Sequence, residues 1–224
     1  MFDGNLKTMQ NIFKISIIFI LTGLPLLSEG QPFVLSETGT AIQIKGTSTL
    51  HDWTMDLRNF NSGFQIEQEG SLIKGIDNVT FSCKATDIKS ESSLMDTKAY
   101  NALKAGNFPE IKFSSISTTG LASEGTRFTG NLNGKLSVAG ETHDITVPFN
   151  GTFVDSRTIN ITATTDLTMS SFNITPPTAF LGVLKTGDKI SVSFTLQFVQ
   201  KTLSQNHIID KQQNNNYIIN NQSQ

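Results

Sequence analysis

The chain has 224 residues, with 17 Lys and Arg, 19 Asp and Glu, and a formal net charge of −2. No basic stripe is present to hold phosphates, which argues against nucleic acid as a partner. A single cysteine, Cys83, excludes an internal disulfide framework.

The first residues have the pattern of a secretory signal. Two lysines precede an uncharged apolar run, Ile15 to Leu27. At about 13 residues, this run is shorter than the roughly 20 that span a bilayer. Small residues follow it, as a signal peptidase requires. We predict a signal peptide over residues 1–30, cut after Gly30, with Met9 as an alternative start and an uncleaved membrane anchor as the alternative interpretation. After cleavage we expect a periplasmic or secreted protein with no stable membrane span.

Residues 31–201 have the pattern of one β-rich domain, whereas the Asn/Gln-rich residues 202–224 predict a disordered tail. Within the domain, short runs alternate apolar and polar residues, as strands with one buried face do. Gly, Asn, Asp and Ser separate the runs, as turns require. The apolar members of the clearest runs are Ile42 and Ile44; Trp53, Met55 and Leu57; Val79, Phe81, Cys83 and Ala85; Ile145, Val147 and Phe149; Ile159, Ile161 and Ala163; and Ile190, Val192, Phe194, Leu196 and Phe198.

One segment, Ser92 to Phe113, has a helix-like spacing instead. Ser93 and Asp96 resemble a capping box. Gly106 suits a left-handed stop, and Pro109 forbids continuation. We predict a helix that closes one end of a strand-built container, with packing outside one sheet face as the alternative. Its narrow apolar face consists of Met95, Ala99, Ala102 and Leu103.

The run Arg127 to Val138 places two glycines, Gly130 and Gly134, on the same face as large apolar residues. A glycine inside a strand often marks a bend or a close approach. One interpretation is a strand that turns a barrel corner. Another is that the missing side chains leave room for a ligand, and the two are compatible. The sequence "VAGETHD" that follows predicts a hairpin.

About eight such strands must stack as a sandwich or close into a barrel. With two Tyr and one Trp, the chain lacks the aromatic girdles of an outer-membrane barrel. Its sixteen Phe can line a pocket for an aliphatic or isoprenoid ligand, or simply fill a core. Composition alone leaves both open.

Residues that carry chemistry are few. His51-Asp52 and His143-Asp144 each begin a strand, where adjacent side chains point to opposite faces, so neither pair predicts a metal site. No nucleophile elbow, HExxH or phosphate-binding glycine motif occurs. We expect no enzyme, no metal and no cofactor. His51 and His143 are expected to form hydrogen bonds at turns or at a rim, and Cys83 to be a small buried side chain.

Three stretches resemble the YceI-like lipid/polyisoprenoid-binding family: Thr47 to Ile66, Ser92 to Ser115, and Phe128 to Phe153. The likeness runs from about Pro32 to Val199. Its most specific parts are Phe108 to Phe113 after the helix and the Gly130-x-Leu132 strand leading to Gly140.

This resemblance implies an all-β fold, an extended eight-stranded antiparallel lipocalin-like barrel with one short helix at one end. It also implies a long apolar tunnel for an isoprenoid chain such as a quinone or polyprenol. Family members often carry charged residues before Phe-Gly, but here that stretch is "LTMSSFNI", Leu167 to Ile174. A charged contact to a ligand head group is therefore not expected there.

Together these observations predict an exported protein that carries or sequesters a long-chain isoprenoid. A secreted β-domain with a filled core that acts through its surface is the alternative, and a homodimer stays open. By strand face and by resemblance, the candidate lining residues are Trp53, Met55, Leu57, Met95, Leu103, Phe113, Phe128, Gly130, Leu132, Gly134, Phe172 and Phe194.

Overall fold

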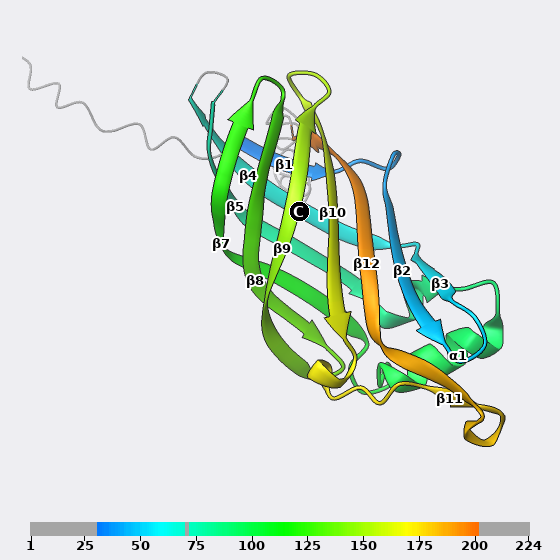
Figure 1. Cartoon of the computed structure of the whole chain (residues 1–224). Coiled ribbons are helices and arrows are strands. Elements are labelled where there is room, and N and C mark those ends of the chain that lie inside the picture. Colours follow the sequence, from blue (N-terminus) through cyan, green and yellow to red (C-terminus); the bar gives the residue numbers. More distant parts are fainter. Residues whose placement is uncertain (1–30, 70–71, 202–224) are drawn as a thin grey trace, which may run out of the picture.

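The computed structural model describes residues 31–69 and 72–201. The predicted signal peptide and the predicted tail lie outside these residues. The described part is built mainly from strands, with one α-helix, α1 (Ser93–Ala102), at one end (Figure 1). The strands are β1 (Gln31–Leu35), β2 (Ala41–Ser48), β3 (Trp53–Leu57), β4 (Phe60–Glu69), β5 (Leu72–Lys84), β6 (Ile88–Lys89), β7 (Glu110–Glu124), β8 (Arg127–Val138), β9 (Glu141–Phe153), β10 (Thr158–Thr168), β11 (Thr178–Ala179) and β12 (Leu184–Gln200).

The strands form one antiparallel sheet that closes on itself. Its order runs β1, β4, β5, β7, β8, β9, β10 and β12, and β12 returns to pair with β1. Closure leaves the ring of eight strands without a free edge, which removes a site of aggregation. The predicted eight-stranded antiparallel barrel with a short helix at one end is therefore confirmed, and the sandwich is not what forms.

Three walls of the barrel each consist of two consecutive strands. β1 and β2 run in the same sense along β12, beside its last and its earlier residues respectively. β4 and β3 pair with β1 and β2 in the same way, and β5 and β6 pair with β4 and β3. Neighbouring walls are therefore neighbours along the chain. The connection between β6 and β7 carries α1.

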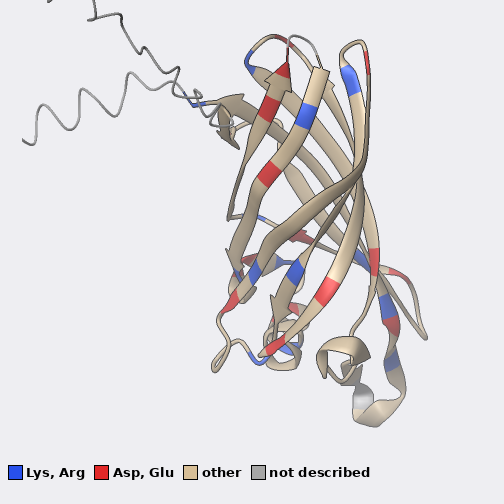
Figure 2. Cartoon of the chain, turned by 90° about the vertical axis from the view of Figure 1, so that its left-hand side faces the viewer, with Lys and Arg blue, Asp and Glu red and all other residues tan. Residues whose placement is uncertain are grey.

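The predicted alternation of strand faces is confirmed. The apolar residues of β12, from Ile190 to Phe198 in steps of two, line the barrel interior, as do Ile145, Val147 and Phe149 of β9. Figure 2 shows positive and negative residues interspersed along the strands, without a large area of one sign.

The predicted hairpin joins β8 to β9, with Val138 opposite Glu141. Its two turn residues, Ala139 (φ 53°) and Gly140 (φ 90°), are both left-handed, the conformation that fits the twist of a two-residue hairpin. A Cβ at Gly140 would lie 2.6 Å from Cζ of Phe108. Glycine is therefore needed there twice over, for its backbone and for the ring that covers it.

Helix α1 begins after Ser92, whose hydroxyl accepts a hydrogen bond from the Met95 N–H at 3.4 Å. The predicted cap, Ser93, is thus wrong by one residue. Asp96 does not complete a capping box, because its carboxylate turns back and accepts from the N–H and the hydroxyl of Ser90 at 2.7 and 2.8 Å. The adjacent serines offer two equivalent start signals.

The helix ends in a Schellman motif around Lys104 (φ 53°), not at Gly106. The Ala105 N–H donates to the Tyr100 carbonyl at 2.9 Å, and the Lys104 N–H donates to the Asn101 carbonyl at 3.1 Å. These bonds satisfy the last carbonyls two residues earlier than predicted. Across residues 31–69 and 72–201, no helix has the length and apolar character needed to cross a membrane.

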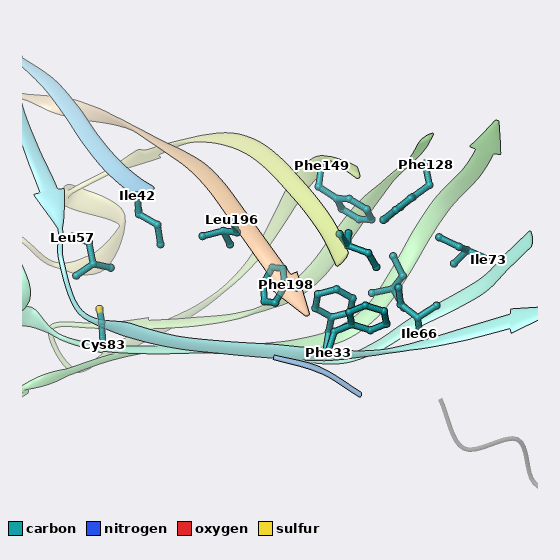
Figure 3. Close-up of a cluster of buried hydrophobic side chains, with 13 residues drawn as sticks. Phe33, Ile42, Leu57, Ile66, Ile73, Cys83, Phe128, Phe149, Leu196 and Phe198 are labelled. Carbon is teal, nitrogen blue, oxygen red and sulfur yellow. The ribbon is translucent and has the colours of Figure 1, made fainter. Parts of the chain in front are cut away.

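Aromatic rings fill the barrel end opposite α1 (Figure 3). Phe33 stacks on Phe64 with ring centroids 5.4 Å apart, and Phe64 meets Phe198 edge to face at 4.7 Å. Phe128 packs against Phe149 at 6.2 Å. We call this end of the interior the aromatic plug, which comprises Phe33, Phe64, Phe128, Phe149, Phe153 and Phe198 with Ile66, Ile73 and Ile159.

Candidate functional site: the barrel cavity

Between the aromatic plug and α1, the barrel is hollow. The cavity has a volume of about 510 Å³, within the roughly 300–1,000 Å³ that is typical of ligand pockets. Phe64, Phe149 and Phe198 lie at its inner end, whereas Phe33 and Phe128 lie behind them and do not reach it. The plug is therefore the floor of the cavity, and the helix end carries its mouth.

Nine of the twelve predicted lining residues lie on the cavity wall. They come from β3, α1, β7, β8, the turn after β10 and β12, so the barrel brings together residues that are far apart in the sequence. The nine are Trp53, Met55, Leu57, Met95, Leu103, Phe113, Leu132, Phe172 and Phe194.

The other three predicted residues, Phe128, Gly130 and Gly134, do not lie on the wall. Phe128 is 1 % exposed within the plug. A Cβ at Gly130 would lie 2.9 Å from Cζ of Phe149, and one at Gly134 would lie 2.4 Å from Cζ of Phe113. The glycines make room for phenylalanine rings of neighbouring strands, so the prediction that they widen the cavity is corrected.

Helix α1 lies across the mouth. Its predicted apolar face, Met95, Ala99, Ala102 and Leu103, lines the cavity. This placement confirms the helix as the cover of one barrel end. The alternative, packing outside a sheet face, does not occur.

Polar contacts hold α1 in this position. The Tyr100 hydroxyl lies 3.0 Å from the carbonyl oxygens of both Thr86 and Ile88, which share its single proton. Burial of Asp96 raises the pKa of its carboxyl, but hydrogen bonds from Ser90 and the Lys89 ammonium at 3.7 Å outweigh burial, so this pKa lies below its ordinary value. The charged carboxylate of Asp96 thus stabilises the residues that lead into α1, through its hydrogen bonds from Ser90.

Polar side chains line the cavity mainly at its mouth. The Lys98 ammonium on α1 donates to the Thr178 carbonyl of β11 at 2.7 Å, and Lys185 is the strand partner of Thr178. Among the described residues, no Asp or Glu lines the cavity. An apolar chain can therefore lie inside with a polar end at the mouth, next to these residues: Ser48, His51, Ser92, Lys98, Thr178, Lys185 and Thr186.

Sequence reasoning missed several residues of the mouth. Lys98 lies three positions after Met95 and one before Ala99. A helical wheel therefore places it at the border of the apolar face and could have predicted its position at the mouth. Met169, Ile174 and Pro177 also line the cavity, but they lie in a segment without two-residue or helical periodicity. No pattern in the sequence could have assigned them to the interior.

His51 lies in the turn before β3, and His143 lies in β9. Nδ1 of His51 lies 2.7 Å from the Asp52 carbonyl oxygen, whereas the His143 ring packs edge to face on Phe172 at 5.0 Å. Among the described residues, no group of three His, Cys, Asp or Glu is placed to hold a metal ion. Cys83 is buried as predicted, and burial, with a smaller effect from Asp87, raises the pKa of its thiol to about 12.

Comparison with known proteins adds to this geometry. The sequence matches the YceI-like domain over residues 33–198. No match was found among curated proteins.

Three solved structures show the similarity of the fold. A polyisoprenoid binding domain from Saccharophagus degradans, implicated in plant cell wall breakdown, aligns with a TM-score of 0.58 and 11% identity over 75% of this chain and 98% of that chain. BcnA of Burkholderia cenocepacia gives 0.55 and 14% over 70% and 95%. The Campylobacter jejuni YCEI protein gives 0.54 and 15% over 66% and 85%.

Proposed function

Because the chain belongs to the YceI-like domain family, we propose that it binds the long apolar chain of an isoprenoid lipid, of the quinone or polyprenol type, in its barrel. It carries or sequesters this lipid outside the cytoplasm, in the periplasm or as a secreted protein. The observation that carries the proposal is the cavity of about 510 Å³, with apolar walls, that opens beside α1. The structural similarity to a domain named polyisoprenoid binding supports it.

The cavity wall suits a hydrocarbon chain. Phe, Ile, Leu and Met side chains dominate it, and a chain without polar atoms leaves no hydrogen bond unmade against them. Burial of each CH₂ group contributes roughly 0.8 kcal/mol. Affinity should therefore come mainly from chain length, with weak discrimination between head groups at the mouth. A filled core, the alternative expected from composition, does not describe the barrel between the plug and α1.

The test is to measure lipid that co-purifies with the protein. Native mass spectrometry of the purified protein should show a mass excess that organic extraction releases and identifies as isoprenoid. Ala163 lies on the cavity wall, opposite both Phe149 and Phe194 on the flanking strands. Ala163→Trp should block part of the cavity and lower the amount of bound lipid.

Thr162→Trp is the matched control, because Thr162 is the adjacent residue of β10 and is exposed on the outer face. It should retain full occupancy. A lipid-free wild-type protein that also refuses added geranylgeraniol, or equal occupancy in the two variants, would contradict the proposal.

A further inference from the structure

The most exposed apolar side chains gather at the cavity mouth. Among the large hydrophobic residues that the structure describes, the five most exposed are Leu181 (108 %), Val183 (74 %), Leu50 (67 %), Ile116 (64 %) and Leu94 (63 %). All but Ile116 come from the segments that surround the mouth. We call Leu50, Leu94, Leu181 and Val183 the apolar collar. Exposed apolar patches of this kind mark interaction sites.

Hydrogen bonds tie together the three segments that carry the collar. They are the tip between β2 and β3, the first turn of α1 and the residues between β11 and β12 (Figure 1). The Thr49 N–H donates to the Lys185 carbonyl at 3.0 Å, and the Thr49 hydroxyl donates to the Val183 carbonyl at 3.4 Å. The bond from Lys98 to Thr178 joins α1 to β11. The collar is thus one surface.

This surface is continuous with the interior. Leu50 and Leu94 line the cavity and are also exposed. An apolar path therefore leads from the cavity to the outside of the barrel. The collar differs in this from Ile116, which is exposed on β7 but does not line the cavity.

Size and charge decide which partner suits the collar. Four side chains on three separate segments are few beside the roughly 20–30 residues per partner of a stable protein interface. A bilayer surface accepts apolar tips without a complementary shape. Lys98 and Lys185 at the mouth suit lipid phosphates, although exposed Asp52 and Glu91 nearby keep the net charge small. Apolar contact should therefore supply most of the binding.

We infer that the apolar collar docks on the surface of a lipid bilayer and holds the cavity mouth against it. The inference extends the proposed function, because a chain that passes between a bilayer and a docked mouth does not cross water. It places loading and release at the helix end of the barrel.

The test is flotation with vesicles of phosphatidylcholine that contain a minor share of phosphatidylglycerol. Leu181→Asn with Val183→Thr removes the two most exposed collar side chains, and neither residue lines the cavity. Asn tolerates the left-handed backbone of Leu181 (φ 54°). Vesicle binding should weaken about tenfold or more. The control, Ile116→Thr with Val154→Thr, changes two exposed apolar residues away from the mouth and should float as the wild type does.

Occupancy and flotation separate this inference from the proposed function. The collar variant should keep its co-purified lipid in native mass spectrometry while it loses vesicle binding. Lipid occupancy in a wild-type protein that never floats would overturn docking alone, and flotation without occupancy would overturn the proposed function alone. Equal flotation of the collar variant and the wild type would also overturn docking. Docking is likewise overturned if sedimentation shows that the collar variant converts a wild-type dimer to monomer, since the collar then serves a second copy.

Discussion

The two ends of the barrel are built from the same alternating strands but are packed differently. At the plug end, Phe33, Phe64 and Phe198 of the adjoining strands β1, β4 and β12 pack ring against ring, and they belong to one buried cluster with Phe128 and Phe149 of β8 and β9. At the mouth end, the walls leave a cavity of about 510 Å³, bounded by a helix whose facing residues include Ala99 and Ala102. The alternation of apolar residues decides which side chains face inward, but side-chain size and cross-strand partners decide whether the opposite walls meet.

Pairs of glycine and phenylalanine on adjacent strands occur at both ends. Phe128 lies directly opposite Gly151 in the plug, and a Cβ at Gly151 would lie 2.1 Å from Cζ of that ring. Nearer the mouth, the Phe113 ring covers Gly134 diagonally, because Leu136 is the residue directly opposite Phe113. Rings that lie flat over a neighbouring strand fill the wall itself. Such pairs therefore do not decide whether the barrel interior is packed, as in the plug, or hollow, as near the mouth.

The largest expected effect is at the plug. Phe128→Ala should lower the free energy of unfolding by about 3–5 kcal/mol, because it opens a cavity among rings that pack closely. Urea denaturation measures this loss. Native mass spectrometry should still find lipid in the folded fraction, because Phe128 does not reach the cavity. A loss under about 1 kcal/mol would show that the plug is not close-packed.

A bulky residue at Gly134 should destabilise the fold rather than shorten the lipid it accepts. A Cβ there would lie 2.4 Å from the Ser114 carbonyl oxygen, which belongs to the backbone of β7. Gly134→Leu should therefore cost about 3 kcal/mol in urea denaturation.

Gly106 offers a matched control for this substitution, because a Cβ there meets nothing within 4 Å. Gly106→Leu should change stability by less than about 0.5 kcal/mol. A stable Gly134→Leu protein that accepts only shorter chains would restore the interpretation of the glycines as a source of width.

Leu132 tests the hollow end directly. It is half-buried on the cavity wall, so Leu132→Ala should cost about 1–2 kcal/mol, below the usual range for a packed leucine. The cost should increase when the protein is saturated with an isoprenoid. The bound chain then contacts Leu132 in the wild-type protein, and the Ala variant loses those contacts. A penalty equal to that of Phe128→Ala, unchanged by lipid, would show that the two ends do not differ.

The smallest expected effect concerns Asp96, beside the helix that covers the mouth. The pKa of its carboxyl is below its ordinary value, so the ionised form stabilises the fold above the unfolded-state pKa of about 3.9. That contribution is lost as the pH falls through the lower folded-state pKa. Asp96→Asn should cost about 1 kcal/mol at neutral pH and progressively less in acid. Urea denaturation of the wild type and the variant at neutral and at acidic pH measures this. A difference in the free energy of unfolding that stays the same at both pH values would contradict the prediction.

Much of the fold could be predicted from the sequence, because strand faces follow a local rule. The period of two in β12 placed Phe194 correctly on the cavity wall without knowledge of any partner strand. The helix could be predicted because its apolar spacing is also a local pattern, but the residues at which it begins and ends were predicted incorrectly. Ser92 and Ser93 are chemically identical, so the sequence does not show which of them caps the helix. The left-handed conformation of Lys104 could not be predicted, because lysine is not a residue type that favours it.

The rest depends on which residues lie opposite one another. The sequence does not reveal the register that pairs Phe149 with Gly130. Because of this pairing, the Phe149 ring occupies the space that the missing side chain of Gly130 leaves. Nor does any periodicity place Met169 or Pro177 at the mouth. The lining residues on the strands follow mostly from strand faces, whereas the floor of the cavity follows only from the folded barrel.

The most direct test of the hollow barrel is a crystal structure with an isoprenoid alcohol that carries bromine at the end of its chain. Anomalous scattering locates the bromine independently of the protein atoms. We expect a peak inside the barrel, on the cavity side of Phe64 and Phe198, and none within the plug. A bromine found only on the outer surface, or an interior with side chains in contact from wall to wall, would contradict the hollow barrel.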